Sequence, residues 1–402
     1  MATETVLHSF SGADGAGPVS NMLSGKAGAI YGTTLFGGKG AGCVFKLTPA
    51  SSGYAETIVY DFNGGLDGIS PWGIVAGAKG VIYGITFLGG SSGNGGNGWG
   101  TVYELTPGAS GDTERVLYRF KGSPDGWEPI GPPVVAGDGS IFGVTSFGGA
   151  RNAGTIFRLT PRGSGYKESI VYSFPGGSGG NLPQAGLTID KHGNIYGTTM
   201  YGGGTQGYCG SAGGCGTVFE LTPAGSGYSE RVIHAFTGSD GNLPFGTLTV
   251  NERTGVVFGT TFWGGAFTDG TVFKLSPHGA SYSESVLYSF NGKNDGFLPE
   301  GTLLLQRGGT LYGTAALGGG GCNGIGCGTV FSLVPSGSHY EFGVLLAFKR
   351  PVNGAEPQQT NLLMDSGGAL YGTTRSGGAG TQCSDGGPGG ASGCGTVFRL
   401  TP

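Results

Sequence analysis

Short apolar stretches alternate with glycine-rich turns along the whole chain. In the second repeat, residues 73–76, 81–86, 100–106 and 114–120 are rich in β-branched and aromatic residues and are bounded by Gly, Pro, Asp or Ser. Residues of the first kind favour strands, and those at the boundaries favour turns. The pattern predicts four strands in each repeat and no helices.

The same unit recurs seven times, with a period of about 57 residues. A Tyr-Gly or Phe-Gly pair marks its second strand, at Tyr31, Tyr83, Phe142, Tyr196, Phe258, Tyr312 and Tyr371. A Thr-Val-Phe segment, such as residues 217–219, marks its third strand. Four-stranded units repeated four to eight times are typical of β-propellers. We therefore expect an all-β, seven-bladed propeller that forms a single domain over residues 1–402.

The two ends of the chain are complementary parts of one repeat. The chain begins with a fourth strand, residues 4–10, and ends with a third strand, residues 395–402. The last repeat therefore lacks its own outer strand, and the N-terminal strand can supply it. Sharing one blade between the two ends closes the ring and protects the strand edges.

Six of the seven cysteines lie in pairs, each in the loop between the second and third strands of a repeat: Cys209/Cys215, Cys322/Cys327 and Cys383/Cys394. Such a loop can bring both cysteines within disulfide distance, and three local disulfides indicate an oxidising compartment. Zinc ligation is the alternative, but no histidine or second pair has ligand spacing nearby. Cys43 replaces the Thr of its repeat, and we expect a small buried residue there rather than a nucleophile.

Composition excludes some functions. The 92 glycines would suggest low complexity if they lacked a period, but here they fall at fixed turn positions. A charged fraction of 11% and a net charge of −4 argue against nucleic-acid binding. No apolar run approaches the ~18–20 residues of a membrane helix. We expect a monomer with no nucleic-acid partner and no membrane span.

The motif Tyr-Gly-Thr-Thr-x-x-Gly-Gly at residues 196–203, followed by Gly-Thr-Val-Phe-x-Leu-Thr-Pro at 216–223, resembles the tandem Gloeo–Verruco (GloVer) repeat of bacterial surface proteins with varied anchors. The resemblance extends over essentially the whole chain. It implies an exported bacterial protein, secreted or at the cell surface, and implies no particular activity. No signal peptide or C-terminal anchor is visible, and we expect any that the natural protein carries to have been removed.

Some titratable residues follow the repeat and are expected to be structural. Glutamates occupy one equivalent position before the outer strand in six repeats, where the remaining repeat has Phe342: Glu4, Glu56, Glu114, Glu168, Glu230 and Glu284. His8 and His234 stand where other repeats have Tyr. Positions that are fixed by the repeat are poor candidates for catalysis.

The variable loops predict the functional face, because the loops between repeats and those between second and third strands lie on one side of a propeller. The residue after each loop proline opens the innermost strand and should lie near the mouth of the channel: Val19, Trp72, Ile130, Gln184, Phe245, Glu300 and Gln358. The residue before each Gly-Gly forms a second ring, for which packing between blades is the simpler explanation: Phe36, Leu88, Phe147, Tyr201, Trp263, Leu317 and Ser376.

Aromatic residues on these loops suggest a ligand-binding surface, since an aromatic body with a polar edge suits a sugar. The candidate binding residues are Trp72, Trp99, Trp127, Tyr201, Tyr208, Phe245 and Trp263. With few charges and many loop aromatics, binding of a polysaccharide is the first hypothesis. A protein-binding adhesion or scaffold role is an alternative.

Three carboxylates on the same face lie outside the repeat pattern: Glu128, Glu300 and Glu356. They are candidate acid–base groups of a glycoside hydrolase or polysaccharide lyase, although solvated loop charges are the simpler explanation. Asp-Gly pairs in the loops between repeats are expected to form tight turns. A ring of Ca²⁺ sites is the alternative there, but each loop offers one obvious carboxylate, and no other cofactor is indicated.

Overall fold

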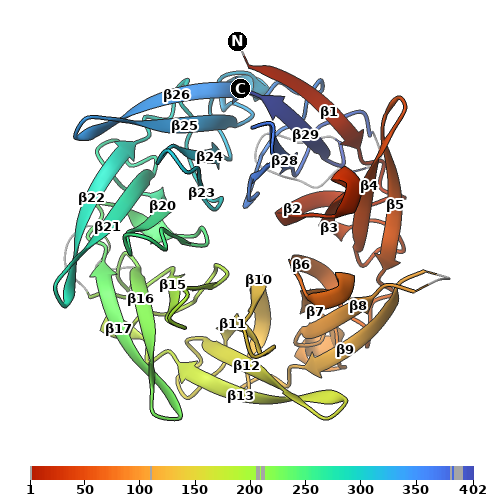
Figure 1. Cartoon of the computed structure of the whole chain (residues 1–402), viewed down its shortest axis with the longest axis vertical. Helices are drawn as coiled ribbons and strands as arrows, with labels where there is room; N and C mark the ends of the chain where they lie inside the picture. Colours follow the sequence, from red (N-terminus) through yellow and green to blue (C-terminus); the bar gives the residue numbers. More distant parts are fainter. Residues whose placement is uncertain (1, 109–110, 205–208, 210–212, 381–382, 384–392) are drawn as a thin grey trace.

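A closed ring of seven antiparallel sheets confirms the predicted seven-bladed β-propeller (Figure 1). This computed structural model describes residues 2–108, 111–204, 209, 213–380, 383 and 393–402. Those residues contain no α-helix, only short 3-10 turns between strands. Within the same residues, no helix is long and apolar enough to cross a membrane.

Each blade has four strands, and we number the blades 1 to 7 in the order of their innermost strands. The innermost strands are β2 (Ala16–Ser24), β6 (Ile69–Ala76), β10 (Trp127–Val135), β14 (Thr188–Ile189), β19 (Thr249–Val250), β23 (Leu304–Leu305) and β27 (Leu363–Met364). The second strands are β3 (Ile30–Phe36), β7 (Ile82–Leu88), β11 (Ile141–Phe147), β15 (Ile195–Thr199), β20 (Val257–Trp263), β24 (Leu311–Ala315) and β28 (Leu370–Thr374).

The outer half of each blade is a longer hairpin. The third strands are β4 (Cys43–Ala50), β8 (Thr101–Thr106), β12 (Thr155–Arg162), β16 (Thr217–Ala224), β21 (Thr271–His278), β25 (Thr329–Ser336) and β29 (Thr396–Thr401). The outer strands of blades 1 to 7 are β5 (Gly53–Asp61), β9 (Thr113–Arg119), β13 (Gly165–Ser173), β17 (Gly227–Ala235), β22 (Ser281–Ser289), β26 (His339–Ala347) and β1 (Thr3–Ser9). In blade 5, a short additional strand, β18 (Asn242–Pro244), also pairs with β20.

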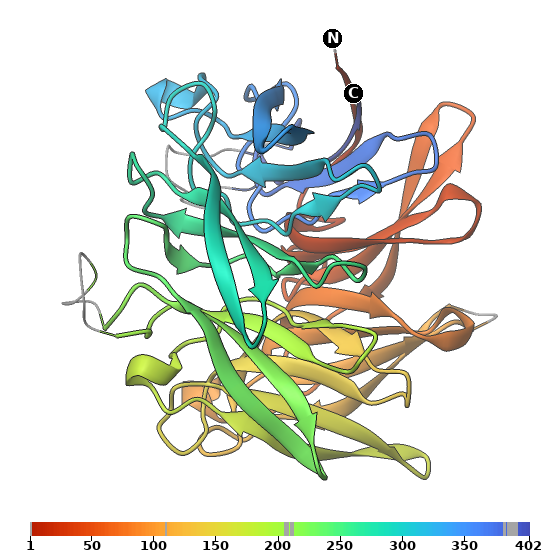
Figure 2. The ribbon, with the colours of Figure 1, turned by 60° about the vertical axis from the view of Figure 1, so that its left-hand side comes forward.

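The N-terminal strand closes the ring as predicted. β1 pairs antiparallel with β29, and Thr3 lies opposite Thr401. Figures 1 and 2 both show the two chain ends together in this shared blade. The innermost strand of blade 2 begins earlier than predicted, because Pro71 lies inside β6 at a shift of the register. At such an irregularity the missing N–H of a proline does not break the ladder of hydrogen bonds.

Pairs of aromatic rings between neighbouring blades form the core. The Phe that follows each outer strand packs edge-to-face against the central aromatic residue of the next blade's third strand, with ring centroids 5.1 or 5.2 Å apart. The seven pairs are Phe10–Phe45, Phe62–Tyr103, Phe120–Phe157, Phe174–Phe219, Phe236–Phe273, Phe290–Phe331 and Phe348–Phe398. Edge-to-face geometry is favourable for aromatic pairs, so one repeated contact joins every blade to the next.

The glycine of each Tyr-Gly pair makes room for this core. A Cβ atom on Gly32 would lie 2.5 Å from Cζ of Phe45 on the adjacent strand. Only a residue without a side chain lets the ring lie flat over the second strand. The recurring Tyr-Gly motif is therefore explained by packing, without reference to function.

The repeated titratable residues are structural, as expected. The Tyr near the end of an outer strand donates a hydrogen bond to the Asp of the following loop, as Tyr118 Oη does to Asp125 Oδ1 at 2.8 Å. His8 and His234 replace this Tyr and contact their loop aspartates at 2.9 and 3.1 Å. The repeated glutamates are half-buried between outer strands, where Glu230 accepts a hydrogen bond from Tyr172 of the preceding blade.

The cysteines are paired as predicted. Cys209–Cys215, Cys322–Cys327 and Cys383–Cys394 form disulfides, with Cα atoms 5.1 to 5.3 Å apart. Cys43 is a free cysteine that is fully buried, and its Sγ lies 3.2 Å from Oγ1 of Thr34. It packs as a small core residue.

Candidate functional site

The loops between blades converge on the mouth of the central channel, where a pocket of about 450 Å³ opens. Five of the seven residues that follow a loop proline line this pocket: Val19, Trp72, Phe245, Glu300 and Gln358. Gln184 lines the adjoining narrow part of the channel. Ile130 is instead buried in the core between blades 3 and 4. The residue after the loop proline was expected to lie near the mouth, and in five of the seven blades it lines the mouth pocket.

Aromatic side chains form two walls of the mouth. Trp72 packs against Phe87 with ring centroids 5.6 Å apart, and Phe245 packs against Phe262 at 6.0 Å. The first pair belongs to blade 2 and the second to blade 5, which lie on different sides of the ring (Figure 1). All four side chains are only partly buried, so their faces are accessible from the mouth.

Polar side chains from blades 6 and 7 form a further wall, beside Val19, Leu35 and Phe36 of blade 1. Nη1 of Arg375 donates a hydrogen bond of 2.7 Å to Oε1 of Gln358. Glu300 is only 7% exposed. Burial raises the pKa of this carboxyl to about 8, although the charge of Arg375 lowers it, and the charge of Glu356 raises it further. At neutral pH, Glu300 is therefore mainly a neutral carboxylic acid, which can donate as well as accept a hydrogen bond.

Glu356 is less accessible than Glu300. It is 2% exposed, and its carboxylate lies 3.8 Å from the guanidinium of Arg350. A buried charge is tolerated when a partner of opposite charge compensates it. Of the two adjacent glutamates proposed as an acid–base pair, only Glu300 lines the mouth pocket.

Residues two positions before the Gly-Gly pairs were not predicted to lie at the mouth. The seven equivalent residues are Leu35, Phe87, Ser146, Met200, Phe262, Ala316 and Arg375, of which Ala316 is fully buried. Phe36 and Leu88 of the predicted ring before each Gly-Gly line the mouth pocket. Leu35, Phe87 and Arg375 line the mouth pocket. Oγ of Ser146 accepts a hydrogen bond of 2.9 Å from Nε2 of Gln184. Leu35 and Phe87 belong to second strands, where successive residues face opposite ways and alternation could have identified them. Arg375 follows the end of β28, where this signal is absent.

An unusual backbone conformation sets the position of the mouth residues. The residue before each loop proline has a positive φ, between 53° and 61°: Gly17, Ser70, Glu128, Leu182, Leu243, Leu298 and Glu356. This conformation is costly for a non-glycine residue, and proline disfavours a helical conformation in the residue before it. The N–H of the strained residue donates to the preceding blade, as that of Glu356 does to the carbonyl of Cys327 at 2.8 Å. Contacts between blades thus hold the strained turn.

The channel narrows sharply next to the mouth. There, a space of only about 20 Å³ is lined by Gln184, Thr302, Gln359 and Asn361 together with the backbone of Gly131 and Gly186. The amide of Asn361 accepts a hydrogen bond from the N–H of Thr302 in the neighbouring blade. Trp72, Pro132 and Phe245 also line this space, so its walls combine polar and apolar groups.

The remaining predicted ligand-binding residues lie in other places on the loops. Trp99 and Trp127 pack against each other at 5.5 Å, and Trp127 stacks on Phe147 at 4.2 Å. Trp263 is 37% exposed and borders a separate pocket of about 480 Å³ with Asn242 and Thr268. The structure therefore does not bring the loop tryptophans together into one surface.

Two further predicted residues, Tyr201 and Glu128, do not line the mouth pocket or the narrow part of the channel. Tyr201 is partly buried and forms an isolated bridge with Asn181. Tyr208 lies outside the residues that the structure describes. Glu128 occupies one of the strained turns, and burial raises its pKa.

The loop aspartates are engaged by their own loops. Oδ2 of Asp67 accepts hydrogen bonds from the hydroxyl of Tyr60 and from the N–H of Asn63. Asp295 has the same two kinds of donor, from Tyr288 and Asn291. These contacts fit the tight turns predicted for the Asp-Gly pairs. In the described part of the chain, no three or more His, Cys, Asp or Glu side chains are grouped to hold a metal ion.

Solved structures with a related architecture are distant in sequence. An oxidoreductase described as a glucose dehydrogenase, from Thermus thermophilus, is 16% identical with a TM-score of 0.48, and all of both chains is covered. The PQQ-bound aldose sugar dehydrogenase of Streptomyces coelicolor is 14% identical with a TM-score of 0.46, over 82% of this chain and 93% of that one. A luciferin-regenerating enzyme is 14% identical with a TM-score of 0.48, over 83% and 91%. At these values we draw nothing about activity from them.

The family relationship is clear at the sequence level. No curated protein matches the chain in sequence. The Gloeobacter/Verrucomicrobia repeat, in contrast, matches twice, over residues 1–209 and 205–402. Together these two matches cover the entire chain, and the protein therefore belongs to the Gloeobacter/Verrucomicrobia repeat family.

Proposed function

We propose that this protein binds a carbohydrate chain at the mouth of its central channel and acts as a secreted or cell-surface binding protein. The observation that carries this proposal is the composition of the mouth pocket. It combines aromatic faces at Trp72 and Phe245 with hydrogen-bonding groups at Glu300, Gln358 and Arg375. Sugars present apolar C–H faces and a rim of hydroxyl groups, so a site of this kind can satisfy both.

The three disulfides support the proposed location. They lie in the loops between second and third strands, on the same side of the propeller as the mouth. Disulfides persist in oxidising environments such as the bacterial periplasm and the cell exterior. A binding protein whose loops around the binding site are cross-linked by disulfides fits such an environment.

A direct test is retention of the protein on a panel of insoluble polysaccharides, with isothermal titration calorimetry on their soluble fragments. Trp72→Ala and Phe245→Ala are expected to weaken binding at least tenfold. Trp263→Ala is the matched control, because Trp263 is an exposed aromatic residue on the same loops but outside the mouth pocket. Loss of binding in Trp263→Ala but not in Trp72→Ala would move the site away from the mouth.

An enzymatic role is the second candidate, because Glu300 is a buried carboxyl group with a raised pKa. A general acid needs such a group. Hydrolysis would also require a second accessible carboxylate, whereas Glu356 is buried beside Arg350. Binding without reaction is therefore the better-supported function.

The same panel separates these roles when it is assayed for released oligosaccharides. Products that disappear in Glu300→Gln would establish an enzyme. Retention without products would establish a binding protein. Neither signal on any polymer would exclude both carbohydrate roles and favour a protein partner.

A further inference from the structure

On the face opposite the mouth, a tyrosine fills the space between most neighbouring blades. It comes from the hairpin between the third and outer strands and packs against the aromatic residue of the Tyr-Gly motif in the preceding blade. The Tyr166 and Tyr83 hydroxyls lie 3.2 Å apart, and the rings of Tyr228 and Phe142 meet edge-to-face at 6.1 Å. Equivalent pairs are Tyr282–Tyr196, Tyr340–Phe258 and Tyr54–Tyr371.

Two interfaces lack this tyrosine: the one between blades 6 and 7, where Ala2 stands at the equivalent position, and the one between blades 1 and 2. Asp112 occupies the equivalent position, two residues before the repeated glutamate. Within the described part of the chain, blade 2 therefore supplies no hairpin tyrosine to pack against Tyr31 of blade 1. A pocket of about 500 Å³ lies at this interface, and Tyr31, Leu23 and Ile82 contribute to its walls.

Three lysines surround the same pocket. Lys46 lies opposite Tyr31 in the strand register, and its Nζ is 5.6 Å from the centre of the Tyr31 ring. Lys26 and Lys79 are exposed and belong to the short turns η1 (Lys26–Gly28) and η2 (Ala78–Gly80) of the two blades. Across the described residues, none of these three ammonium groups lies within 4.0 Å of a carboxylate oxygen.

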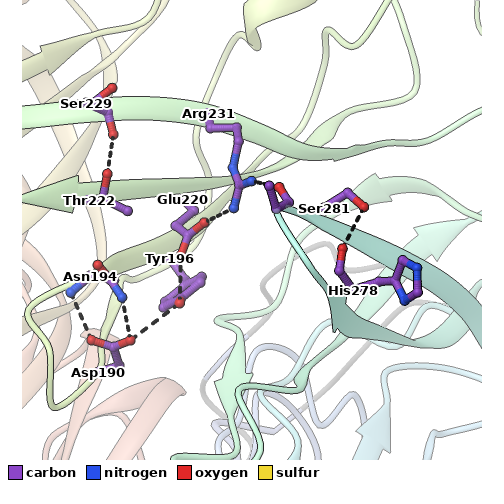
Figure 3. Close-up of polar contacts among 10 residues, drawn as sticks. Asp190, Asn194, Tyr196, Glu220, Thr222, Ser229, Arg231, His278 and Ser281 are labelled. Carbon is purple, nitrogen blue, oxygen red and sulfur yellow. Dashed lines mark hydrogen bonds and ion pairs between the residues drawn. The ribbon is translucent and has the colours of Figure 1, made fainter.

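Blade 4 shows the contrasting arrangement at the corresponding place (Figure 3). There, Glu220 takes the position of Lys46, and its carboxylate is paired with Arg231 at 2.5 Å. The adjoining turn carries Asp190, whose carboxylate accepts hydrogen bonds from Asn194. The carboxylate of Glu220 is thus paired within blade 4. Blades 1 and 2 instead place three lysines around one pocket, with no carboxylate within ion-pair distance among the described residues.

We propose that the pocket between blades 1 and 2 is a second binding site, which takes a small organic anion: a phosphate, sulfate or carboxylate attached to an apolar body. Lys26, Lys46 and Lys79 supply charge-assisted hydrogen bonds to the anionic group. The ring of Tyr31 and the side chains of Leu23 and Ile82 contact the body. This site lies on the opposite face from the carbohydrate site and does not depend on it.

Phenyl phosphate tests the proposal, because it joins an anionic group to an apolar ring. Inorganic phosphate has only the anionic group, and benzyl alcohol has the ring without the charge. We expect saturable binding of phenyl phosphate by isothermal titration calorimetry, at least fivefold weaker binding of inorganic phosphate, and none of benzyl alcohol. Asp112→Tyr introduces the residue found at five of the other six interfaces, so it should fill the pocket and weaken binding at least tenfold. Lys274→Met is the matched control, because Lys274 has the same register position in blade 5 beside a filled interface, and it should change affinity less than twofold.

Several outcomes would overturn the proposal. They are absence of saturable binding, equal affinity for inorganic phosphate and phenyl phosphate, and binding that survives in Asp112→Tyr. If Asp112→Tyr does not fold, the double variant Lys26→Met/Lys79→Met decides instead, since both side chains are exposed. Binding must then fall at least fivefold, and an unchanged affinity would exclude the site.

Discussion

Gly395 of the last blade lies against Pro18 of the first so closely that a Cβ atom on Gly395 would be 2.5 Å from Cδ of the proline. The N–H of Gly17, just before this proline, donates a hydrogen bond of 2.9 Å to the carbonyl of Cys394. The same glycine–proline contact recurs at every interface between blades, for example between Gly270 and Pro299. One contact thus explains why a glycine directly precedes each third strand and why a proline lies in each connection between blades.

We predict that Gly395→Ala destabilises the propeller more than a change of backbone preference would. Gly395 and Gly40 both have positive φ, 93° and 110°, but a Cβ on Gly40 would meet nothing within 4 Å. Gly40→Ala should therefore cost only about 1–2 kcal/mol for the unfavourable φ. Gly395→Ala should cost about 1–3 kcal/mol more, because its Cβ would also lie 2.4 Å from the carbonyl oxygen of Thr374 and 2.5 Å from Cδ of Pro18, so these neighbours must move. Urea unfolding of the two variants checks this, and equal losses would show that the contacts with Thr374 and Pro18 relax without cost.

The features that the sequence predicts well are those that follow from a local pattern shared by the repeats. Blade number, ring closure and the disulfide pairs all follow from equivalent positions in the repeats. Phe342 shows the strength of this reasoning, since it replaces the repeated glutamate and stacks on Tyr288 with ring centroids 3.9 Å apart. One position between outer strands therefore accepts either a carboxyl or a ring, as a structural role requires.

The candidate site was harder to predict, because it depends on side chains from different blades. Arg375 lies at the mouth just beyond the end of β28, whereas its neighbour Ser376, which the Gly-Gly motif indicated, is buried. Trp99 and Trp127 come from the loops of adjacent blades, so they pack together instead of facing the channel. No linear pattern indicates that Arg350 compensates the charge of Glu356.

The repeated glutamates predict a specific dependence of stability on pH. Burial, with the neighbouring charge of Asp67, raises the pKa of Glu114 to about 7. Because the folded state holds this proton more tightly than the unfolded state, its stabilisation is complete below about pH 4.5 and is lost as the pH rises to about 7. Glu114→Gln removes this loss and should gain about 0.5–1 kcal/mol relative to wild type between pH 5 and pH 8.

Thermal unfolding at these two pH values measures the effect. Glu341→Gln is the control, because Glu341 lies on the outer strand of blade 6 but is exposed. It should show the same difference from wild type at both pH values. If Glu114→Gln and Glu341→Gln behave alike, the burial of Glu114 has no consequence for folding.

We predict that replacing Cys43 with threonine stabilises the protein. Five blades have a hydrogen bond of 2.7 or 2.8 Å between two threonine hydroxyls, as in Thr86–Thr101. At the equivalent place in blade 1, Oγ1 of Thr34 lies 3.2 Å from Sγ of Cys43. Cys43→Thr should restore the stronger hydrogen bond and stabilise the protein by about 0.5–1 kcal/mol. Cys43→Val has nearly the same shape without the hydroxyl and should be less stable than Cys43→Thr. The reverse order would contradict the explanation.

The thiol of Cys43 should also be unreactive in the folded protein. Burial raises its pKa to about 12, so almost no thiolate exists at pH 8. Ellman's reagent should label no thiol in the native protein and one after unfolding without reduction. Rapid labelling of the native protein would show that the interface around Cys43 opens.

The pair of Arg375 and Glu300 allows the electrostatics of the mouth to be tested without a ligand. Because burial raises the pKa of Glu300 to about 8, stability associated with its protonated form is lost as the pH rises from about 4.5 to about 8. The charge of Arg375 lowers this pKa, so Arg375→Met should raise it and extend the loss to higher pH. The deficit of Arg375→Met relative to wild type should therefore grow by about 1 kcal/mol between pH 5 and pH 9.

A double-mutant cycle separates this effect from the hydrogen bond between Arg375 and Gln358. In the Glu300→Gln background no carboxyl remains to titrate at that position, so the deficit caused by Arg375→Met should be the same at pH 5 and pH 9. Arg162→Met controls for the loss of one positive charge, because Arg162 is exposed and belongs to blade 3, whereas Arg375 belongs to blade 7. Suppose instead that Arg375→Met destabilises the protein equally at pH 5 and pH 9 even when Glu300 is present. Arg375 would then act on the mouth only through Gln358, and the pKa of Glu300 would not respond to the charge of Arg375.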